Sequence, residues 1–407
     1  MAIKGYAVLI LGSMFLAPQV QAALQPDGDA RPPAFGSSLK EDRRERKKRK
    51  PPTQRPPVVP EAQIASGAVP QDASEIRVET NLVLNDVLVL DKRGQPLRGL
   101  LSHDFAVFED GREQDIAVFT NDAREIPRSI ILVIDYSLSQ LPHIENSVEA
   151  AKILIDRMKP FDKMAIVTDD VELLADYTSD KESLKSRLDS LRAKAMWGEF
   201  GRSKQYSSLL AALNERCARD GSRQIVIFQT DGDEFQTLAR KDRIRKSDFS
   251  FEDITAAALG AGVTVYTVFT GTVLSGMPER EKMRKTESAL NRSRKLYSLV
   301  RKKPDMQIEI DFAANYVRAT ARQIELDAGS LDKIAAVTGG LAQSLEDPTK
   351  AVEIYDRILA DIDRRYLIGY YPINQVRDGK EREVKILVKG RGDYKIIGRT
   401  SYIAPLQ

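Results

Sequence analysis

Three oxygen-bearing side chains occupy alternate positions directly after a purely aliphatic run at residues 130–134. They are Asp135, Ser137 and Ser139. A tight loop leaving a strand can turn all three oxygens toward one point. Carboxylate and hydroxyl oxygens are hard ligands that favour Mg²⁺, Mn²⁺ or Ca²⁺ over softer metals. The spacing therefore predicts a divalent-cation site, with Mg²⁺ as the first candidate.

A second apolar run ends in a carboxylate in the same way. Residues 225–228 are apolar, and Thr230, Asp231, Gly232 and Asp233 follow shortly after. Runs of this kind, with no polar alternation, suit strands that are buried on both faces of a parallel sheet. Sites in such sheets lie beyond the carboxyl ends of the strands, so we expect Asp231 and Asp135 to meet at one edge.

The pattern D-x-S-x-S at residues 135–139, with the T-D-G-D run at residues 230–233, resembles the metal-ion-dependent adhesion site of the von Willebrand factor A family. Residues 204–213 stand where that family has a G-G-T-x-L loop and helix, which places Ser207 where a threonine is usual. The resemblance implies that Asp135, Ser137, Ser139 and Ser207 hold or orient the metal. It also implies that Asp231 contributes directly or through water, and that a partner protein offers an acidic side chain to the open position.

Other interpretations of these residues remain open. Asp and Ser also cap helices and turns, which would make this a degenerate metal site on a scaffold. A metal-dependent hydrolase would need a nearby base, and the chain has two histidines, His103 and His143. Further acids are expected near the same edge of the sheet, namely Asp169, Asp170, Asp233 and Glu234. No phosphate loop, nucleophile elbow or Cys/His zinc cluster appears, so we expect a binding protein rather than an enzyme.

The elements that position these residues alternate between strand and helix. Strands are expected at residues 163–167, 173–177 and 263–269, and helices at residues 144–158, 181–192 and 251–259. Such alternation predicts a doubly wound α/β fold with a mostly parallel sheet. We expect this domain to span residues 126–371, with a closing strand at residues 366–371 and a basic insertion at residues 272–327. The insertion is either a solvated helical excursion or a docking surface for an acidic partner.

Both flanks of this domain have the alternation and turn signals of antiparallel strands. Residues 75–124 and 372–407 are therefore expected to form one small β domain from the two ends of the chain.

The N-terminal region predicts export. In residues 1–22 a lysine precedes a short apolar run and a V-Q-A sequence, which together indicate a secretory signal peptide, with an uncleaved anchor as the alternative. Residues 23–74 are rich in proline and charge and contain a basic run, so a disordered linker is expected. Export argues against nucleic acid as its partner, and peripheral contact with the cell envelope is the expectation. The whole sequence thus predicts a periplasmic or extracellular protein-binding module.

Overall fold

The computed structural model describes residues 34–40, 82–121, 126–217, 222–234, 249–300 and 313–406. The predicted signal peptide and most of the predicted linker lie outside these ranges. Among the described residues, no helix combines the length and apolar character needed to cross a membrane.

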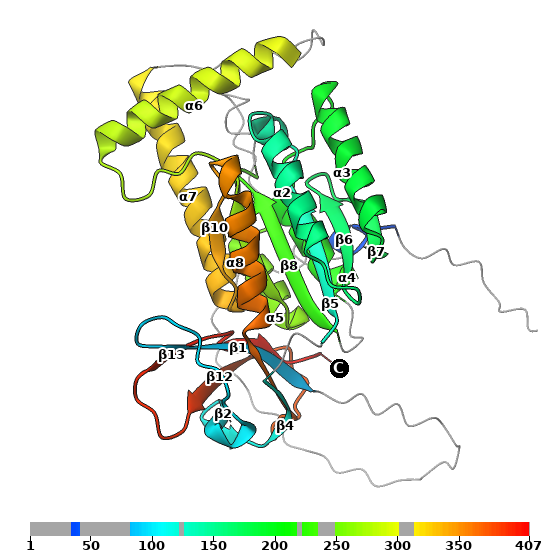
Figure 1. Cartoon of the computed structure of the whole chain (residues 1–407), viewed down its shortest axis with the longest axis vertical. Coiled ribbons are helices and arrows are strands. Elements are labelled where there is room, and N and C mark those ends of the chain that lie inside the picture. The colour runs from blue at the N-terminus through cyan, green and yellow to red at the C-terminus, as the bar shows by residue number, and fades with distance from the viewer. Residues whose placement is uncertain are drawn as a thin grey trace, which may run out of the picture. The chain divides into compact units, whose positions relative to one another are not determined.

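A six-stranded sheet forms the centre of the α/β region (Figure 1). Neighbouring strands in this sheet run parallel, except that β7 is antiparallel to β6. The prediction of a mixed α/β fold with a mostly parallel sheet is therefore confirmed. In spatial order the strands are β10 (Ala342–Ser344), β9 (Thr264–Phe269), β8 (Arg223–Thr230), β5 (Arg128–Ile134), β6 (Lys163–Thr168) and β7 (Glu172–Thr178).

Helices cover both faces of this sheet, which explains why β5 is buried along its whole length. Ile130 and Leu132 of β5 belong to the core on one face, whereas Ile131 and Val133 belong to the core on the other. This division follows from the alternation of side chains along a strand. One face is covered by α2 (Ile144–Asp156), α3 (Lys181–Met196) and α8 (Ala351–Asp363), and the other by α4 (Gln205–Arg216), α5 (Phe251–Ala261) and α7 (Ala314–Thr338).

The described part of the predicted basic insertion is mainly helical. It contains α6 (Glu279–Val300) and the first half of α7, and the two helices pack against each other. Lys282 of α6 pairs with Glu325 of α7, with 2.5 Å between Nζ and Oε1. Because α7 continues without a break to Thr338, the expected boundary at residue 327 falls inside a helix.

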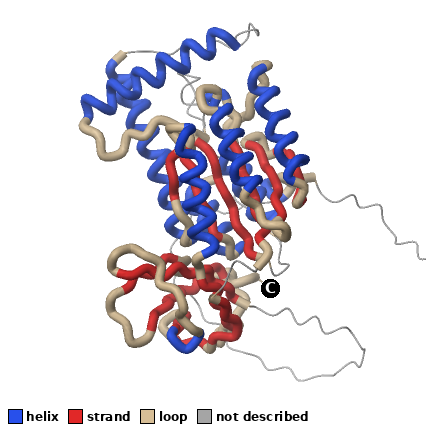
Figure 2. Tube along the Cα trace, viewed as in Figure 1, coloured by secondary structure: helices blue, strands red, loops and turns tan. Residues whose placement is uncertain are grey.

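Two four-stranded antiparallel sheets lie beside the α/β region (Figure 2). They contain strands from both ends of the chain, since β12 (Glu381–Val388) pairs with β2 (Phe105–Glu109) and β13 (Tyr394–Ile397) pairs with β1 (Val83–Asp91). The remaining strands are β3 (Arg112–Gln114), β4 (Ile116–Thr120), β11 (Tyr366–Tyr370) and β14 (Ser401–Ile403).

The expectation that residues 366–371 close the central sheet is wrong. The strand there, β11, pairs with β1 and β4 in an antiparallel sheet. Its side chains Tyr366, Ile368 and Tyr370 are buried in a separate core with Phe105. The α/β region therefore ends with α8.

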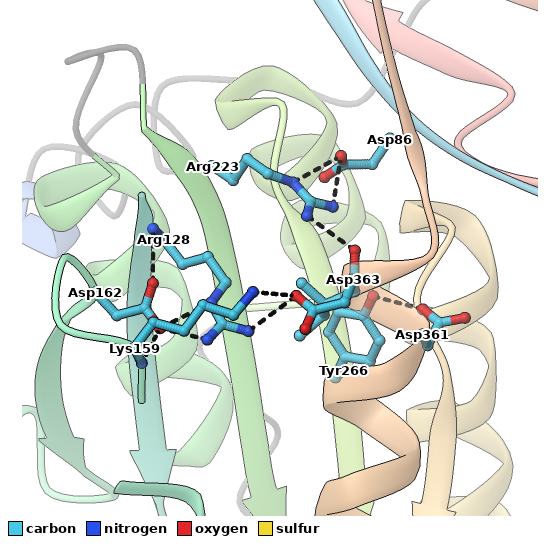
Figure 3. Close-up of polar contacts among 9 residues, drawn as sticks. Asp86, Arg128, Lys159, Asp162, Arg223, Tyr266, Asp361 and Asp363 are labelled. Carbon is cyan, nitrogen blue, oxygen red and sulfur yellow. Dashed lines mark hydrogen bonds and ion pairs between the residues drawn. The ribbon is translucent and has the colours of Figure 1, made fainter. Parts of the chain in front are cut away.

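Buried ion pairs gather at the amino end of the central sheet (Figure 3). Arg128, at the start of β5, donates from Nε to Asp162 at 2.9 Å, and both side chains are 1% exposed. Arg223, at the start of β8, pairs with Asp86 of β1 at 2.7 Å. This second pair ties the α/β region directly to the antiparallel sheets.

A short part of the predicted disordered linker is ordered, which corrects that prediction for residues 35–40. Phe35 and Leu39 pack into the same core as α4 and α5. The amides of Gly36 and Ser38 both donate to the carboxylate of Glu215 on α4, each at 2.8 Å. Two apolar side chains and two backbone hydrogen bonds thus hold this stretch against the α/β region.

Candidate functional site

The topology of the central sheet brings two predicted site residues to one place. The strand order reverses its direction between β5 and β8, and such a switch point leaves a crevice outside the carboxyl ends of the strands. Asp135 follows β5 and Asp231 follows β8. These two strands are adjacent and in register, with Ile134 opposite Gln229.

Asp135 lies at the base of this crevice and is 2% exposed. Its Oδ1 accepts a hydrogen bond from the Ser137 amide at 2.9 Å. Its Oδ2 accepts from Thr230 Oγ1 and from Gln205 Nε2, both at 2.8 Å. A carboxylate has about four acceptor positions, so these three donors leave room for another ligand.

Hydroxyl groups connect Asp135 to Asp231. Ser137 Oγ and Ser139 Oγ are 3.0 Å apart. The Ser139 hydroxyl in turn lies close enough to the Asp231 carboxylate to act on its pKa in the lowering direction, whereas the charge of Asp135 acts in the raising direction. The structure thus brings four of the five predicted ligands together.

The fifth predicted ligand, Ser207, lies in the first turn of α4 and is buried. No hydrogen bond joins it to the other four in the described part of the chain. From this helix it is Gln205 that reaches Asp135. Its role as a metal ligand therefore stays a prediction.

The electrostatics of the site disfavour negative charge. Burial, and then the charge of Asp169, raise the pKa of Asp135 to about 7, against the effect of its hydrogen bonds. Burial, followed by the charges of Asp135 and Asp233, also raises the pKa of Asp231. Neither Asp135 nor Asp231 pairs with a lysine or arginine among the described residues. A bound cation would relieve this repulsion.

The donor set suits a hard cation. Asp135, Ser137, Ser139 and Asp231 offer two carboxylates and two hydroxyls, which are the oxygen ligands that Mg²⁺ and Ca²⁺ prefer. No group of three or more His, Cys, Asp or Glu side chains in the described residues is arranged to hold a metal ion. A site here would therefore depend on the serine hydroxyls and on water as well as on the two carboxylates.

The other acids expected at this edge support the surrounding loops. Asp169 accepts hydrogen bonds from the amides of Tyr136 at 3.1 Å and Ser203 at 2.8 Å. Burial raises its pKa to about 7. Asp170 accepts from the hydroxyl of Tyr136, and Glu234 from the amide of Tyr206 at the start of α4. These contacts fix the loop that carries the serines.

The two histidines have different surroundings. His143 precedes α2, and its pKa is lowered, first by burial and then by the charge of Arg292. His103 lies in a short 3-10 helix before β2, with an exposed side chain. His143 is thus the histidine that lies at the candidate site.

A cavity of about 230 Å³ adjoins the candidate cation site. Ser139, Asp231 and His143 line it from the edge of the sheet. The opposite wall comes from α6 and α7, so the insertion is part of this site. Residues of these two helices in the wall include Thr286, Leu290, Tyr316, Gln323 and Asp327.

Sequence reasoning missed Gln205 and Asp327. Gln205 precedes Ser207 by two positions in a segment where the family resemblance indicates only a hydroxyl ligand. Asp327 comes from α7, where burial and the charge of Asp233 raise its pKa to about 8. The sequence contained no spacing signal for it, because only the packing of α7 brings it to the edge.

No known protein family matches this chain, and no curated protein matches it. Similar solved structures include the conserved hypothetical protein BatB from Bacteroides thetaiotaomicron, with 16% identity, a TM-score of 0.35, and coverage of 58% of this chain and 98% of that one. An aerotolerance-related membrane protein from Bacteroides fragilis gives the same values. The vWF domain of the type V pili tip protein Mfa5 from Porphyromonas gingivalis has 12% identity and a TM-score of 0.29, covering 49% of this chain and 96% of that one. These TM-scores are all below 0.5, and the fold is defined by the strand order and contacts given above.

Proposed function

We propose that this protein is a binding module whose carboxyl sheet edge holds a divalent cation, Mg²⁺ in the first instance, and through it an acidic group of a partner protein. The observation that carries the proposal is the convergence of Asp135, Ser137, Ser139 and Asp231 at the switch point, with no basic side chain paired to either carboxylate in the described residues. Hard oxygens and uncompensated negative charge are the two requirements of such a site.

Each of these residues has a distinct task in the proposal. Asp135 and Asp231 supply the charge that attracts the cation. Ser137 and Ser139 supply neutral oxygens that add no further negative charge, so the cation with its two carboxylates is neutral overall and an open coordination position can still take a carboxylate. Asp169 holds the backbone amides of Tyr136 and Ser203, which keeps the serine loop in place before the cation arrives.

Binding rather than catalysis is part of the proposal, as is an exported location. The support for export is the signal-like sequence of residues 1–22. Contact of the basic linker with the cell envelope belongs to the same proposal, and nucleic acid is not an expected partner.

Metal-dependent thermal stability tests the site. We expect Mg²⁺ to raise the melting temperature of the full chain, and Asp135→Ala to abolish this rise while the metal-free variant stays folded, because the cation loses its most buried carboxylate. Differential scanning calorimetry with Mg²⁺ and with chelator measures both quantities.

A matched control is Asp115→Ala, which removes an exposed carboxylate between β3 and β4 and should leave the Mg²⁺ response unchanged. An equal Mg²⁺ response in the Asp135→Ala variant would reject the site. Pull-down of envelope proteins with the wild type and the variant then tests whether partner capture needs the same carboxylate. Capture that ignores both chelator and Asp135→Ala would reject the cation-bridged mode.

A further inference from the structure

The cavity beside the candidate cation site shares Asp231 with that site and adds groups that the cation does not use, Asp327 and Thr286. It lies between the sheet edge and the α6–α7 pair, and its lining combines acidic groups with an apolar wall. Asp231, Asp233 and Asp327 line it, and no lysine or arginine does so among the described residues. The apolar wall consists of Phe269, Ala289, Leu290, Ala319 and Ile324.

Thr286 is the second independent feature. Its side chain lines the cavity and is 0% exposed, yet its hydroxyl has no hydrogen-bond partner among the described residues. A threonine in a helix can satisfy its hydroxyl on a carbonyl one turn earlier, as Thr320 does with Tyr316 at 3.0 Å. A buried hydroxyl without a partner costs free energy, so a ligand group that bonds to it would be favoured.

The carboxylates of Asp231 and Asp327 lie close enough to influence each other. The charge of Asp231 contributes to the shifted pKa of Asp327. Asp327 also packs directly against the Asp231 loop, because a β-carbon added to Gly232 would lie 3.0 Å from Asp327 Cβ. Asp233 also lines the cavity, and a group of acids beside an unpartnered hydroxyl matches the three N–H donors of a primary ammonium group.

We propose that this cavity binds a small primary amine with an apolar body. The ammonium group lies at Asp231, Asp327 and Thr286, and the apolar body lies against Leu290 and Phe269. The size fits, because an engineered cavity of about 150 Å³ holds benzene and this one measures about 230 Å³. The inference goes beyond the proposed function and does not require the cation.

Three ligands that share one ring test the charge requirement: benzylamine, benzyl alcohol and benzoate. We expect isothermal titration of the full chain in chelator to show binding of benzylamine, affinity about tenfold lower for benzyl alcohol, and none for benzoate, since a charged hydrogen bond is stronger than a neutral one. Absence of benzylamine binding at millimolar concentrations would overturn the proposal. Equal affinity for all three ligands would do the same.

Two substitutions locate the amine. Asp327→Asn should lower benzylamine affinity at least tenfold, whereas Asp332→Asn, at an exposed position of the same helix, should leave it unchanged. Thr286→Val keeps the side-chain shape and removes the unpartnered hydroxyl. It should weaken benzylamine severalfold without lowering the melting temperature of the ligand-free protein. Unchanged affinity in Thr286→Val would place the amine elsewhere and overturn the proposal. This test remains valid even if the Asp327→Asn variant does not fold.

The Asp135→Ala variant separates this inference from the proposed function. Asp135 is not among the residues that line the cavity. Benzylamine binding should therefore survive in that variant although the Mg²⁺ response is lost. Loss of amine binding in a folded Asp135→Ala protein would contradict the assigned position.

Discussion

The two ends of the central sheet use the same residue type in opposite ways. At the amino end, aspartates accept hydrogen bonds from buried cations: Asp162 from Arg128 and Asp86 from Arg223 (Figure 3), and Asp361 from Arg365. At the carboxyl end, buried or partly buried aspartates have only neutral donors. Asp135, Asp169, Asp231 and Asp327 make no ion pair with lysine or arginine in the described part of the chain.

This difference separates structure from function. The charge of a buried carboxylate is neutralised when a guanidinium pairs with it. Such a pair holds strands and sheets together and needs no ligand. A group of buried carboxylates without a basic partner keeps its negative charge uncompensated. Burial and mutual repulsion then raise the pKa values of these carboxylates and favour the binding of an external cation. The candidate site thus lies at the end of the sheet where the protein leaves its own charge uncompensated.

The largest effect is expected at the amino end. Arg128→Met would leave Asp162 as an unpaired buried charge, since both side chains are 1% exposed. We expect a loss of about 3–5 kcal/mol in the free energy of unfolding, the usual cost of breaking a buried pair from one side. Chemical denaturation with urea measures it.

An exposed ion pair serves as the control for this change. Arg357 and Glu353 on α8 are 2.8 Å apart, but their side chains are more than half exposed. Arg357→Met should cost under about 0.5 kcal/mol. A similar loss in both variants would mean that burial does not distinguish the amino-end pairs from surface pairs.

A smaller change in the free energy of unfolding is expected when the pH is raised, and it comes from the aspartates at the carboxyl end. The native pKa values are about 7 for Asp135 and Asp169 and about 8 for Asp327, whereas an unfolded aspartate titrates near 3.9. A raised native pKa means that the folded state binds the proton more tightly. The resulting stability is complete below the unfolded pKa and is lost as pH rises through 7 to 8.

We therefore expect the metal-free protein to lose on the order of 2 kcal/mol of unfolding free energy between pH 6.5 and pH 8.5. Mg²⁺ should restore more stability at pH 8.5 than at pH 6.5, because protons compete with it for Asp135 and Asp231. Calorimetry at both pH values, with Mg²⁺ and with chelator, checks the two trends. A metal-free protein that becomes more stable over this range would contradict the description of this edge as uncompensated.

The sequence predicted the centre of the fold well, because local patterns determine it. The aliphatic runs at residues 130–134 and 225–228 became neighbouring buried strands, as uninterrupted apolar runs suggest. The sequence did not reveal which sheet would take β11, because its residues are buried in either position. The docking of residues 35–40 could not be predicted from composition, because the average composition of a long polar linker does not reflect two apolar side chains.

At the candidate site, local spacing predicted the loop, whereas long-range packing determined the rest. Asp135, Ser137 and Ser139 share one short loop, and Asp231 follows a repeated strand pattern, so both were visible in the sequence. Asp327 reaches the same place from a helix that follows α6, which no periodicity indicates. Gln205 was overlooked because the resemblance directed attention to hydroxyls, although a buried amide satisfies a carboxylate equally well.

The smallest predicted effect concerns that overlooked residue. Gln205→Met keeps the length and apolar stem of the side chain but removes the Nε2 donor that lies 2.8 Å from Asp135 Oδ2. Losing this bond should cost the metal-free protein about 1–3 kcal/mol. The net loss should be about 1 kcal/mol. The same change removes Gln205 Oε1, which is buried without a partner, and this offsets part of the cost.

The comparison with Mg²⁺ makes this last prediction specific. A cation bound at Asp135 would satisfy the carboxylate that Gln205 no longer reaches, so the loss in Gln205→Met should shrink when Mg²⁺ is saturating. Urea denaturation of wild type and variant, with chelator and with Mg²⁺, gives the four values required. Gln343→Met on β10, where the side chain is partly exposed, should cost less than about 0.5 kcal/mol in both conditions. If the loss in Gln205→Met is the same with and without Mg²⁺, the cation and the amide do not share Asp135, and the carboxyl end would have to be regarded as closed to metal like the amino end.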